Sequence, residues 1–572
     1  MAIDFQEFMS QKIRKEFEIA RTEICCDHKE LTAEYVAMRD GTRLHTWMIF
    51  PKEEKAQYPV ILTRTCYPDN DFMYRIYGEE LAMRGYAFIW QYTRGRESSE
   101  GEWVPNIYER DDGIDTVDWI ISQHWCESLG YWGMSYTSMA GWAMADAVDG
   151  KVASMYLEHY GTDRFVSAYE KGSFRQDVLT SWSMENGPVK TDCSYDRYLE
   201  SCRYMPQAHV DEALWGGRND SYRSYISSPE SDAELWQSGW WKTLREIPEK
   251  TTLPVCLVSG WYDHHHGSSM KTWKRLSDTS KAHSQLVIGA WNHFMQPVIP
   301  GRETQNMHPE EIPPMLEWFE ITLKQKREPE PKVRCYAIGE DKWVENKAWP
   351  IMTESSIWYL EAGQICNKYA GKLIHSEQDN ENTEKSAELT YTYDPQNPVA
   401  SVGGEGLLKT MQQIGSLVQP EAGYRPDVLS FISNPLECDL KITGQIRVEL
   451  YVRSDCEDTA FTAKLIEVIP DGTAYHIRSS ITTIAQDQPK GEKYTPGKVT
   501  KVELSMWDIV YTIKAGHCLR LDISSSDFPQ FNLHCNYAGL WSAQTECRPA
   551  QQTILTGGEY ASRIMINFES GR

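Results

Sequence analysis

The sequence contains no apolar run that approaches the roughly 18 residues of a membrane-spanning helix. Its first segment, MAIDFQEFMSQ, also lacks the basic start and apolar stretch of a secretory signal, because Asp4 and Glu7 stand where those features would be. These two absences predict a cytoplasmic protein.

Cysteines with a metal or redox spacing are missing as well. The 14 cysteines are scattered from Cys25 to Cys547 without a C-x-x-C pair, and in a chain without an export signal such cysteines are usually free. We predict free thiols, no cysteine metal site and no cofactor.

Positive charge is in short supply. The chain has 58 basic and 82 acidic residues, which gives a formal net charge of −24. A strongly acidic protein repels phosphate backbones and anionic lipid surfaces, so nucleic acid and membranes are excluded as expected partners. A chain of 572 residues is also too long for one hydrophobic core, and two or three domains are expected.

The first half of the chain has the texture of a parallel sheet covered by helices. Residues 34–50 predict a hairpin around Asp40-Gly41, and short apolar runs then alternate with helical patterns. This rhythm stops near residue 159 and resumes at Val255, and the stretch between is rich in tyrosine and tryptophan. We predict an α/β domain over 1–159 and 250–350 with a helical cap inserted at 160–249.

Beyond Trp349-Pro350 the texture changes to short alternating strands separated by turn residues. This pattern predicts a jelly-roll β-sandwich over 351–572. Two polar or glycine-rich stretches, residues 376–389 and 403–406, are interpreted as loops.

A tight turn between a strand and a helix carries the first chemical signal. In LGYWGMSYTSMAGWAMADA, small residues surround Ser135, as in the nucleophile elbow that exposes a serine at the carboxyl edge of a sheet. The fifth position of the G-x-S-x-G pattern is Thr137 and not glycine, so the motif alone is weak.

The residues that follow strengthen this signal. Asp263 comes after the strand that ends in SGWYD, and His293 comes after the next strand, in IGAWNH. Ser, Asp, His is the order of an α/β-hydrolase triad. We predict that Ser135 attacks a carbonyl carbon, that His293 moves its proton, and that Asp263 orients the imidazole.

The chain resembles the CocE/NonD hydrolases, which include X-prolyl dipeptidyl-peptidases, cocaine esterase and α-amino-acid ester hydrolases. The resemblance runs through most of the chain, in segments such as RGYAFIWQYTRGRESSEGEW, DDGIDTVDWI, DTAFTAKLIEV and GHCLRLDISSSDFPQF. It implies an α/β-hydrolase core, a helical cap and a jelly-roll third domain. It also implies an oxyanion hole formed by the Tyr67 hydroxyl and the backbone N–H of Tyr136.

The chain departs from the family after Asp263. The α-amino-acid ester hydrolases have carboxylates two and three residues beyond the catalytic aspartate, where they bind the substrate ammonium, but this chain has His265 and His266. We interpret His264, His265, His266 and Trp261 as lining of the substrate pocket. Successive histidines point in different directions, so we predict no metal site here.

Three functions stay open from the sequence. The leading prediction is a carboxylesterase that acts on a small-molecule ester or amide. An amidase or X-prolyl dipeptidyl-peptidase is the first alternative, and an inactive hydrolase scaffold that binds a ligand is the second. The sequence leaves a homo-oligomer open.

Overall fold

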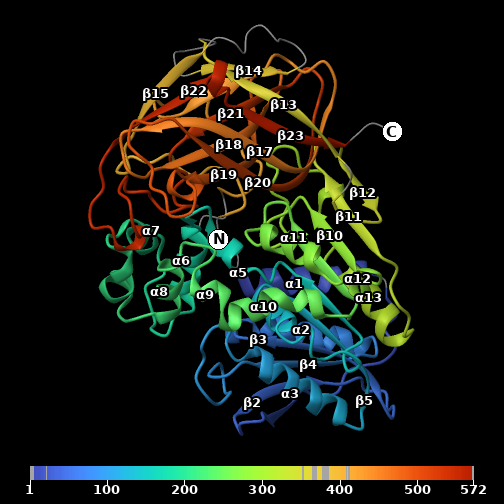
Figure 1. Cartoon of the computed structure of the whole chain (residues 1–572). Helices are drawn as coiled ribbons and strands as arrows, with labels where there is room; N and C mark the ends of the chain where they lie inside the picture. The colour runs from blue at the N-terminus through green and yellow to red at the C-terminus, as the bar shows by residue number, and fades with distance from the viewer. Residues whose placement is uncertain are drawn as a thin grey trace.

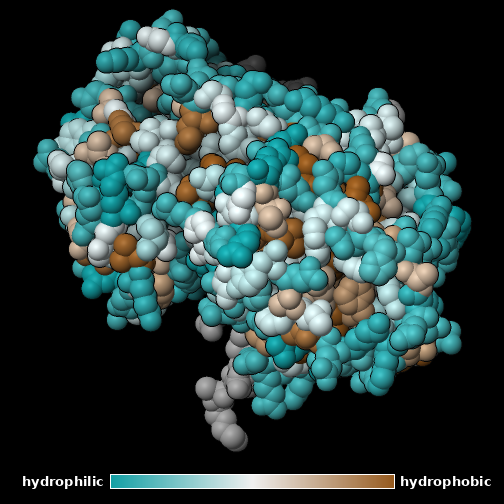
Figure 2. Space-filling view, turned by 90° about the horizontal axis from the view of Figure 1, so that it is seen from below, coloured by the Kyte–Doolittle hydropathy of each residue, from teal (hydrophilic) through white to brown (hydrophobic). Residues whose placement is uncertain are grey.

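The structure is a computed structural model that describes residues 5–20, 22–308, 310–350, 353–363, 370–376, 386–406, 409 and 413–569. Two large sheets dominate it, with a helical region beside them (Figure 1). Polar side chains cover most of the face seen in Figure 2, and apolar ones are scattered over it. None of the helices in the described part of the chain has the length and apolar composition of a membrane-spanning segment.

The first sheet has ten strands in the order β1-β2-β4-β3-β5-β6-β9-β10-β11-β12. The seven strands from β4 to β11 in this order run parallel, and β1, β2 and β12 pair antiparallel at the two edges. The strands are β1 (Thr32–Ala37), β2 (Arg43–Ile49), β3 (Tyr58–Thr65), β4 (Ala87–Tyr92), β5 (Cys126–Met134), β6 (Ser154–Glu158), β9 (Val255–Gly260), β10 (Gln285–Gly289), β11 (Lys332–Ala337) and β12 (Lys342–Asn346).

Helices cover both faces of this sheet, as its fully buried strands require. In β3, Val60 and Leu62 join one apolar cluster with α3 and α4, whereas Ile61 joins a second cluster with α1, α2 and α13. The helices are α1 (Phe5–Ile19), α2 (Asp71–Met83), α3 (Glu109–Ser122), α4 (Tyr136–Trp142), α11 (His266–Arg275), α12 (Asp278–Lys281) and α13 (Ile312–Phe319). The predicted α/β class is confirmed, and so is the hairpin, whose turn contains Gly41 at φ 88°.

The segment between β6 and β9 contributes no strand to either large sheet in the described part of the chain. It contains α5 (Arg164–Ala168), β7 (Tyr169–Glu170), β8 (Ser173–Phe174), α6 (Gln176–Glu185), α7 (Tyr195–Arg203), α8 (Asp220–Ile226), α9 (Glu234–Gln237) and α10 (Gly239–Lys250). We refer to this region, residues 160–249, as the cap. The domain boundaries given above remain a prediction.

The second sheet has eleven strands in the order β15-β22-β17-β23-β13-β14-β16-β21-β18-β19, with β20 paired to β17. They are β13 (Thr353–Glu361), β14 (Ala370–His375), β15 (Ala387–Tyr393), β16 (Leu429–Ile432), β17 (Leu440–Ser454), β18 (Ala460–Val468), β19 (Ala474–Thr483), β20 (Thr500–Ile513), β21 (Cys518–Ser524), β22 (Ala550–Thr556) and β23 (Arg563–Glu569). The predicted β-rich C-terminal region is confirmed.

The two loop predictions in this region had different outcomes. The prediction of a loop over 376–389 is wrong at its end, because residues 387–389 are the first three residues of strand β15 and pair with β22. Residues 377–385 lie outside the described residues. Residues 403–406 form no strand, and Gly404 makes only an isolated bridge to Gly415.

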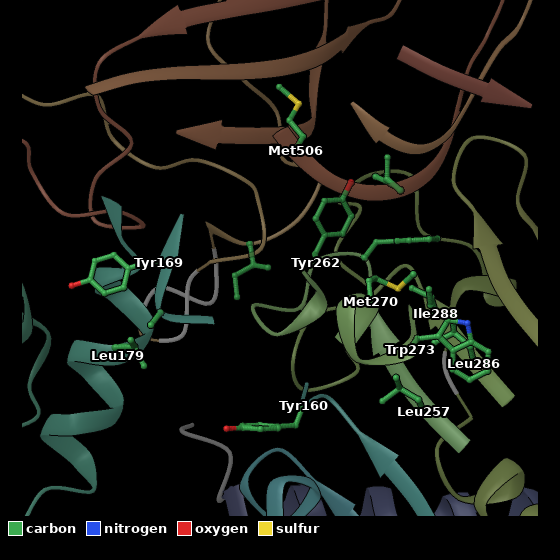
Figure 3. Packing of buried hydrophobic residues seen from close by; sticks show 14 of the residues in the cluster. Tyr160, Tyr169, Leu179, Leu257, Tyr262, Met270, Trp273, Leu286, Ile288 and Met506 are labelled. Atoms are coloured by element: carbon green, nitrogen blue, oxygen red, sulfur yellow. The ribbon is translucent and has the colours of Figure 1, made fainter. Parts of the chain in front are cut away.

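The three regions share one continuous apolar core. Figure 3 shows side chains of this core from the first sheet (Leu257, Ile288), the cap helix α6 (Leu179) and the region of the second sheet, β13 to β23, which we call the sandwich (Met506). Tyr262, which follows β9, points toward the sandwich (Figure 3). Residues beside the predicted triad therefore contact the second sheet as well as the first.

Candidate active site

Four neighbouring parallel strands each end close to one functional side chain. Ser135 follows β5, His159 follows β6, Asp263 lies three residues beyond β9, and His293 lies four residues beyond β10. These strands are adjacent in the sheet, in the order β5-β6-β9-β10. Loops at the carboxyl ends of parallel strands meet at one edge, which is where α/β proteins bind their ligands.

The turn that holds Ser135 has the backbone of a nucleophile elbow. Ser135 has φ 58° and ψ −123°, a conformation that non-glycine residues rarely adopt. Its N–H donates to the Glu158 carbonyl at 2.9 Å, and α4 begins at the next residue. The side chain is half-buried, so a substrate can reach it.

The residues around the elbow explain its sequence. A Cβ atom on Gly133 would lie 2.4 Å from the carbonyl oxygen of Thr137, so only glycine fits there. The Thr137 hydroxyl donates to the Met134 carbonyl at 2.8 Å. The threonine that departs from the family pattern therefore closes the turn with its own side chain.

The structure brings the three predicted triad residues into one hydrogen-bonded chain. His293 Nε2 lies 2.9 Å from Ser135 Oγ, and His293 Nδ1 lies 2.9 Å from Asp263 Oδ1. Because an ionised carboxylate can only accept, His293 Nδ1 carries a proton and Nε2 is left as the acceptor for the serine. This is the tautomer that a general base needs.

Asp263 receives further donors that keep it ionised although it is fully buried. The His265 N–H donates to Oδ1 at 3.0 Å, and His159 Nδ1 lies 2.7 Å from Oδ2. Burial alone would raise the pKa of the Asp263 carboxyl, but the charge interactions with His293 and His159 lower it well below its ordinary value. His159, Asp263 and His293 each have an atom of a kind that can bind a metal ion, and these three atoms lie within 4.8 Å of one another. The hydrogen bonds of the two histidines to Asp263 account for this closeness.

Two of the three histidines after Asp263, His264 and His265, lie close to the ring of His293. The His264 ring contacts the His293 ring at a tilt, with centroids 4.1 Å apart, and the centroid of the His265 ring lies 5.6 Å from that of His293. Burial is the main cause that lowers the pKa of both His264 and His265 well below the ordinary value, so both are neutral at neutral pH. The two neutral imidazoles therefore lie beside the imidazole of the predicted base, His293.

Two residues predicted to line the pocket are packing residues instead. His266 Nε2 lies 3.0 Å from the carbonyl oxygen of Asp508 in β20, and its ring contacts Trp507. Trp261 is fully buried and donates its indole N–H to the Tyr336 carbonyl at 2.8 Å. The pocket assignment of His266 and Trp261 is corrected, because both side chains turn into the core.

The two residues predicted to supply the oxyanion donors have side chains in contact. The Tyr67 and Tyr136 rings meet edge to face with centroids 6.1 Å apart. The Tyr67 hydroxyl accepts the indole N–H of Trp182, on the cap helix α6, at 3.2 Å. Because Tyr136 is the first residue of α4, its N–H has no acceptor within the helix.

Sequence reasoning missed four residues around the site. Trp182 and His159 contact predicted site residues directly, and Glu109 accepts a hydrogen bond from the Tyr136 hydroxyl. Glu158 accepts the indole N–H of Trp132 at 2.9 Å. Glu158 and His159 had one available signal, which is that polar residues directly follow a buried strand at the edge that carries Ser135.

Comparisons with known proteins agree with this arrangement. Residues 40–295 match the family model described as X-Pro dipeptidyl-peptidase (S15 family), and residues 325–565 match its C-terminal non-catalytic domain. A cocaine esterase from Rhodococcus sp. (strain MB1 Bresler) is 27% identical, with 93% of this chain and 97% of that protein covered.

The chain belongs to the CocE/NonD hydrolase family. It is therefore an enzyme of the serine hydrolase class. Two solved structures share its fold. An α-amino-acid ester hydrolase is 20% identical with a TM-score of 0.79 over 95% of this chain and 97% of that one. An aminopeptidase from a marine sediment archaeon, Thaumarchaeota archaeon, is also 20% identical, with a TM-score of 0.78 over 96% and 98%.

Proposed function

We propose that the protein cleaves carboxylic esters through an acyl-enzyme on Ser135. The observation that carries this proposal is the unbroken chain of hydrogen bonds from Ser135 Oγ through His293 to Asp263. Such a chain activates a serine, which is a weak nucleophile without a base beside it. It also argues against an inactive scaffold that only binds a ligand.

The reaction runs in two halves. His293 Nε2 takes the Ser135 proton as Oγ attacks the ester carbonyl carbon, and the C–O bond to the leaving group breaks as His293 returns that proton to the departing oxygen. Water then attacks the acyl-enzyme with His293 again as the base, which releases the carboxylic acid and restores Ser135. Asp263 stabilises the imidazolium form of His293 in both halves.

Tyr67 and Tyr136 bind the oxyanion that forms in each half. Because the Tyr67 oxygen already accepts from Trp182, its own O–H proton is directed to another acceptor. Burial raises the pKa of Tyr67 well above its ordinary value, so the hydroxyl stays protonated and can donate. The Tyr136 N–H at the start of α4 supplies the second donor.

The surroundings of Asp263 favour an acyl group without a charged amine. The two positions where an ammonium group would need carboxylates hold His265 and His266, and burial lowers the pKa of both below the ordinary value, so both are neutral at neutral pH. The aromatic cluster of Trp103, Tyr136 and Trp182 adds apolar surface close to Tyr67. The family model and the aminopeptidase neighbour keep peptide or amide cleavage as the alternative substrate class.

We further propose that the substrate is a small molecule and that the enzyme works in the cytoplasm. The net charge of −24 disfavours nucleic acid and anionic membrane surfaces as partners.

The test combines a covalent probe with a substrate panel. A fluorophosphonate probe should label Ser135, and Ser135→Ala should remove both labelling and turnover of p-nitrophenyl esters. The panel adds aminoacyl esters and dipeptidyl anilides, and preferred cleavage of the anilides would replace the esterase proposal by the peptidase alternative.

Ser138→Ala is the matched control, because Ser138 lies one helical turn from Ser135 and its buried hydroxyl has no hydrogen-bond partner in the described part of the chain. The control should keep native turnover. Labelling that survives Ser135→Ala would contradict the assignment of the nucleophile.

A further inference from the structure

A second histidine binds the aspartate of the triad from the side opposite to His293. His159 Nδ1 lies 2.7 Å from Asp263 Oδ2, and both side chains are fully buried. His293 uses the other oxygen, Oδ1, at 2.9 Å. The carboxylate is therefore held between two imidazoles.

The main chain fixes His159 in this place. The residue has φ 55°, in the left-handed region that few non-glycine residues adopt. Its N–H donates to the Val258 carbonyl in the neighbouring strand β9 at 2.8 Å. Two residues later, a Cβ atom on Gly161 would lie 2.1 Å from the backbone of Ser268, so the loop packs tightly against α11.

The chemistry of the contact has one direction. An ionised carboxylate is only an acceptor, so His159 Nδ1 must be the donor. His159 Nε2 is buried and has no hydrogen-bond partner in the described structure. Burial alone would lower the pKa of His159, but the charge of Asp263 and the hydrogen bond to it raise that pKa above its ordinary value, so the imidazole and the carboxylate stabilise each other.

The contact gives Asp263 a full set of partners. Oδ1 accepts from His293 and from the His265 N–H, and Oδ2 accepts from His159. Without His159, one oxygen of a fully buried carboxylate would lose its donor. The carboxylate could then rotate about its Cβ–Cγ bond, and its alignment with His293 Nδ1 would be lost.

We infer that His159 is a positioning residue that clamps the Asp263 carboxylate so that Oδ1 faces His293 Nδ1. This inference rests on the proposed function of Ser135, Asp263 and His293. His159 hydrogen-bonds to Asp263, and its ring also meets the His293 ring edge to face with centroids 5.6 Å apart. It therefore acts on the reaction through these two triad residues. Its contribution should appear in kcat, because the imidazolium that Asp263 stabilises is formed in the transition state.

The experiment compares two substitutions of similar shape. His159→Asn places an amide N–H2 where Nδ1 stands and tolerates the left-handed backbone, whereas His159→Leu has no donor. We expect His159→Leu to lower kcat about 10- to 100-fold, which is the effect of losing a hydrogen bond to a charged group. KM should stay within about threefold, and His159→Asn should keep kcat within about fivefold of native.

The rate per active site is obtained by titration with a fluorophosphonate burst, so that unfolded protein does not count. His476→Leu is the control, because no described residue hydrogen-bonds to either ring nitrogen of this buried histidine of β19, and the kcat of the variant should be native. If His159→Leu does not fold, His159→Asn alone decides, and a loss of more than about tenfold in kcat would overturn the inference.

Equal losses in the leucine and asparagine variants would show that His159 only fills space, and so would native kcat in His159→Leu. Failure of the proposed function itself gives a different result. In that case Ser135→Ala would keep turnover, whatever the variants of His159 do.

Discussion

Two buried polar networks lie close to each other in this molecule and are built differently. In the first, each oxygen of Asp263 accepts hydrogen bonds of 2.7 to 3.0 Å from histidine nitrogens. In the second, Glu405 lies 3.9 Å from Arg175 and 3.5 Å from Arg478, distances of ion pairs without hydrogen bonds. Among the residues that the structure describes, Nε and Nη1 of both arginines have no hydrogen-bond partner.

The second network joins the cap to the sandwich. Arg175 precedes α6, Arg478 belongs to β19, and Glu405 lies in the loop after β15. The Arg175 guanidinium stacks on Trp507 at 3.9 Å and forms its hydrogen-bonded ion pair with Glu170 instead of Glu405. Burial lowers the pKa of Arg478, which shows how poorly its charge is solvated.

The difference separates two roles for buried charge. Short, directed hydrogen bonds fix the angle between two side chains, as proton transfer requires. Longer ionic contacts determine only which surfaces meet. When one partner of such a buried pair is removed, the protein loses stability because the other charge stays buried without compensation. Breaking the first network should therefore reduce turnover, and breaking the second should reduce stability.

The largest effect should come from Asp263→Asn. The amide cannot hold His293 in the tautomer that accepts the serine proton, and a change of this kind in a serine-protease triad lowers kcat about 10⁴-fold. Steady-state kinetics on a p-nitrophenyl ester measures it, with circular dichroism to check folding. A loss of less than tenfold would mean that the Asp263 network does not serve proton transfer.

Arg478→Met should lower the free energy of unfolding by about 3–5 kcal/mol, because it leaves Glu405 buried beside only one cation. Denaturant unfolding measures this change, and kcat per folded molecule should stay within about tenfold of native. Lys490→Met, at an ion pair with Asp232 in which both side chains are exposed, should change stability by no more than about 1 kcal/mol. A large loss of kcat with native stability would reverse the roles of the two networks.

Tyr67→Phe should lower kcat about 10²- to 10³-fold, or roughly 2.7–4 kcal/mol, by removing one oxyanion donor. KM should change little, because full negative charge on the oxygen exists only in the tetrahedral intermediate. Tyr58→Phe is the control, since the Tyr58 hydroxyl donates to the Glu53 carbonyl far from Ser135. A raised KM with native kcat would instead make Tyr67 a substrate-binding group.

The smallest effect concerns Glu158, whose pKa burial raises to about 7. A carboxyl group that takes up a proton on folding stabilises the protein most below its unfolded value near 4.5, and this contribution is lost as pH rises through about 7. The stability of Glu158→Gln relative to native should therefore rise between pH 5 and pH 8, by up to about 3 kcal/mol.

Unfolding at the two pH values measures this change. The exposed Glu345→Gln variant serves as the control and should show a constant difference from native. An equal difference at both pH values for Glu158→Gln would mean that Glu158 stays ionised in the folded protein.

The sequence by itself determined the elements whose signals are local. The elbow around Ser135 is a property of small residues beside one another, and the order of Ser135, Asp263 and His293 follows from strand ends that apolar runs reveal. The change of texture near Pro350 likewise depends on neighbours along the chain. Hydrophobic periodicity and turn-forming residues depend only on a few neighbouring residues, so the elements that they indicate can be predicted without knowledge of the tertiary structure.

The tertiary structure decided the contacts that join distant segments. His159 and Asp263 are 104 residues apart, and they meet because β6 pairs with β9 across the whole cap insertion. Trp182 of the cap helix α6 reaches Tyr67 over 115 residues because the folded chain brings α6 beside the loop that follows β3. The sequence shows that Trp261 and His266 are close to Asp263 along the chain, but it does not show in which direction their side chains point. Those directions depend on packing against Tyr336 and β20, which only the folded chain brings close.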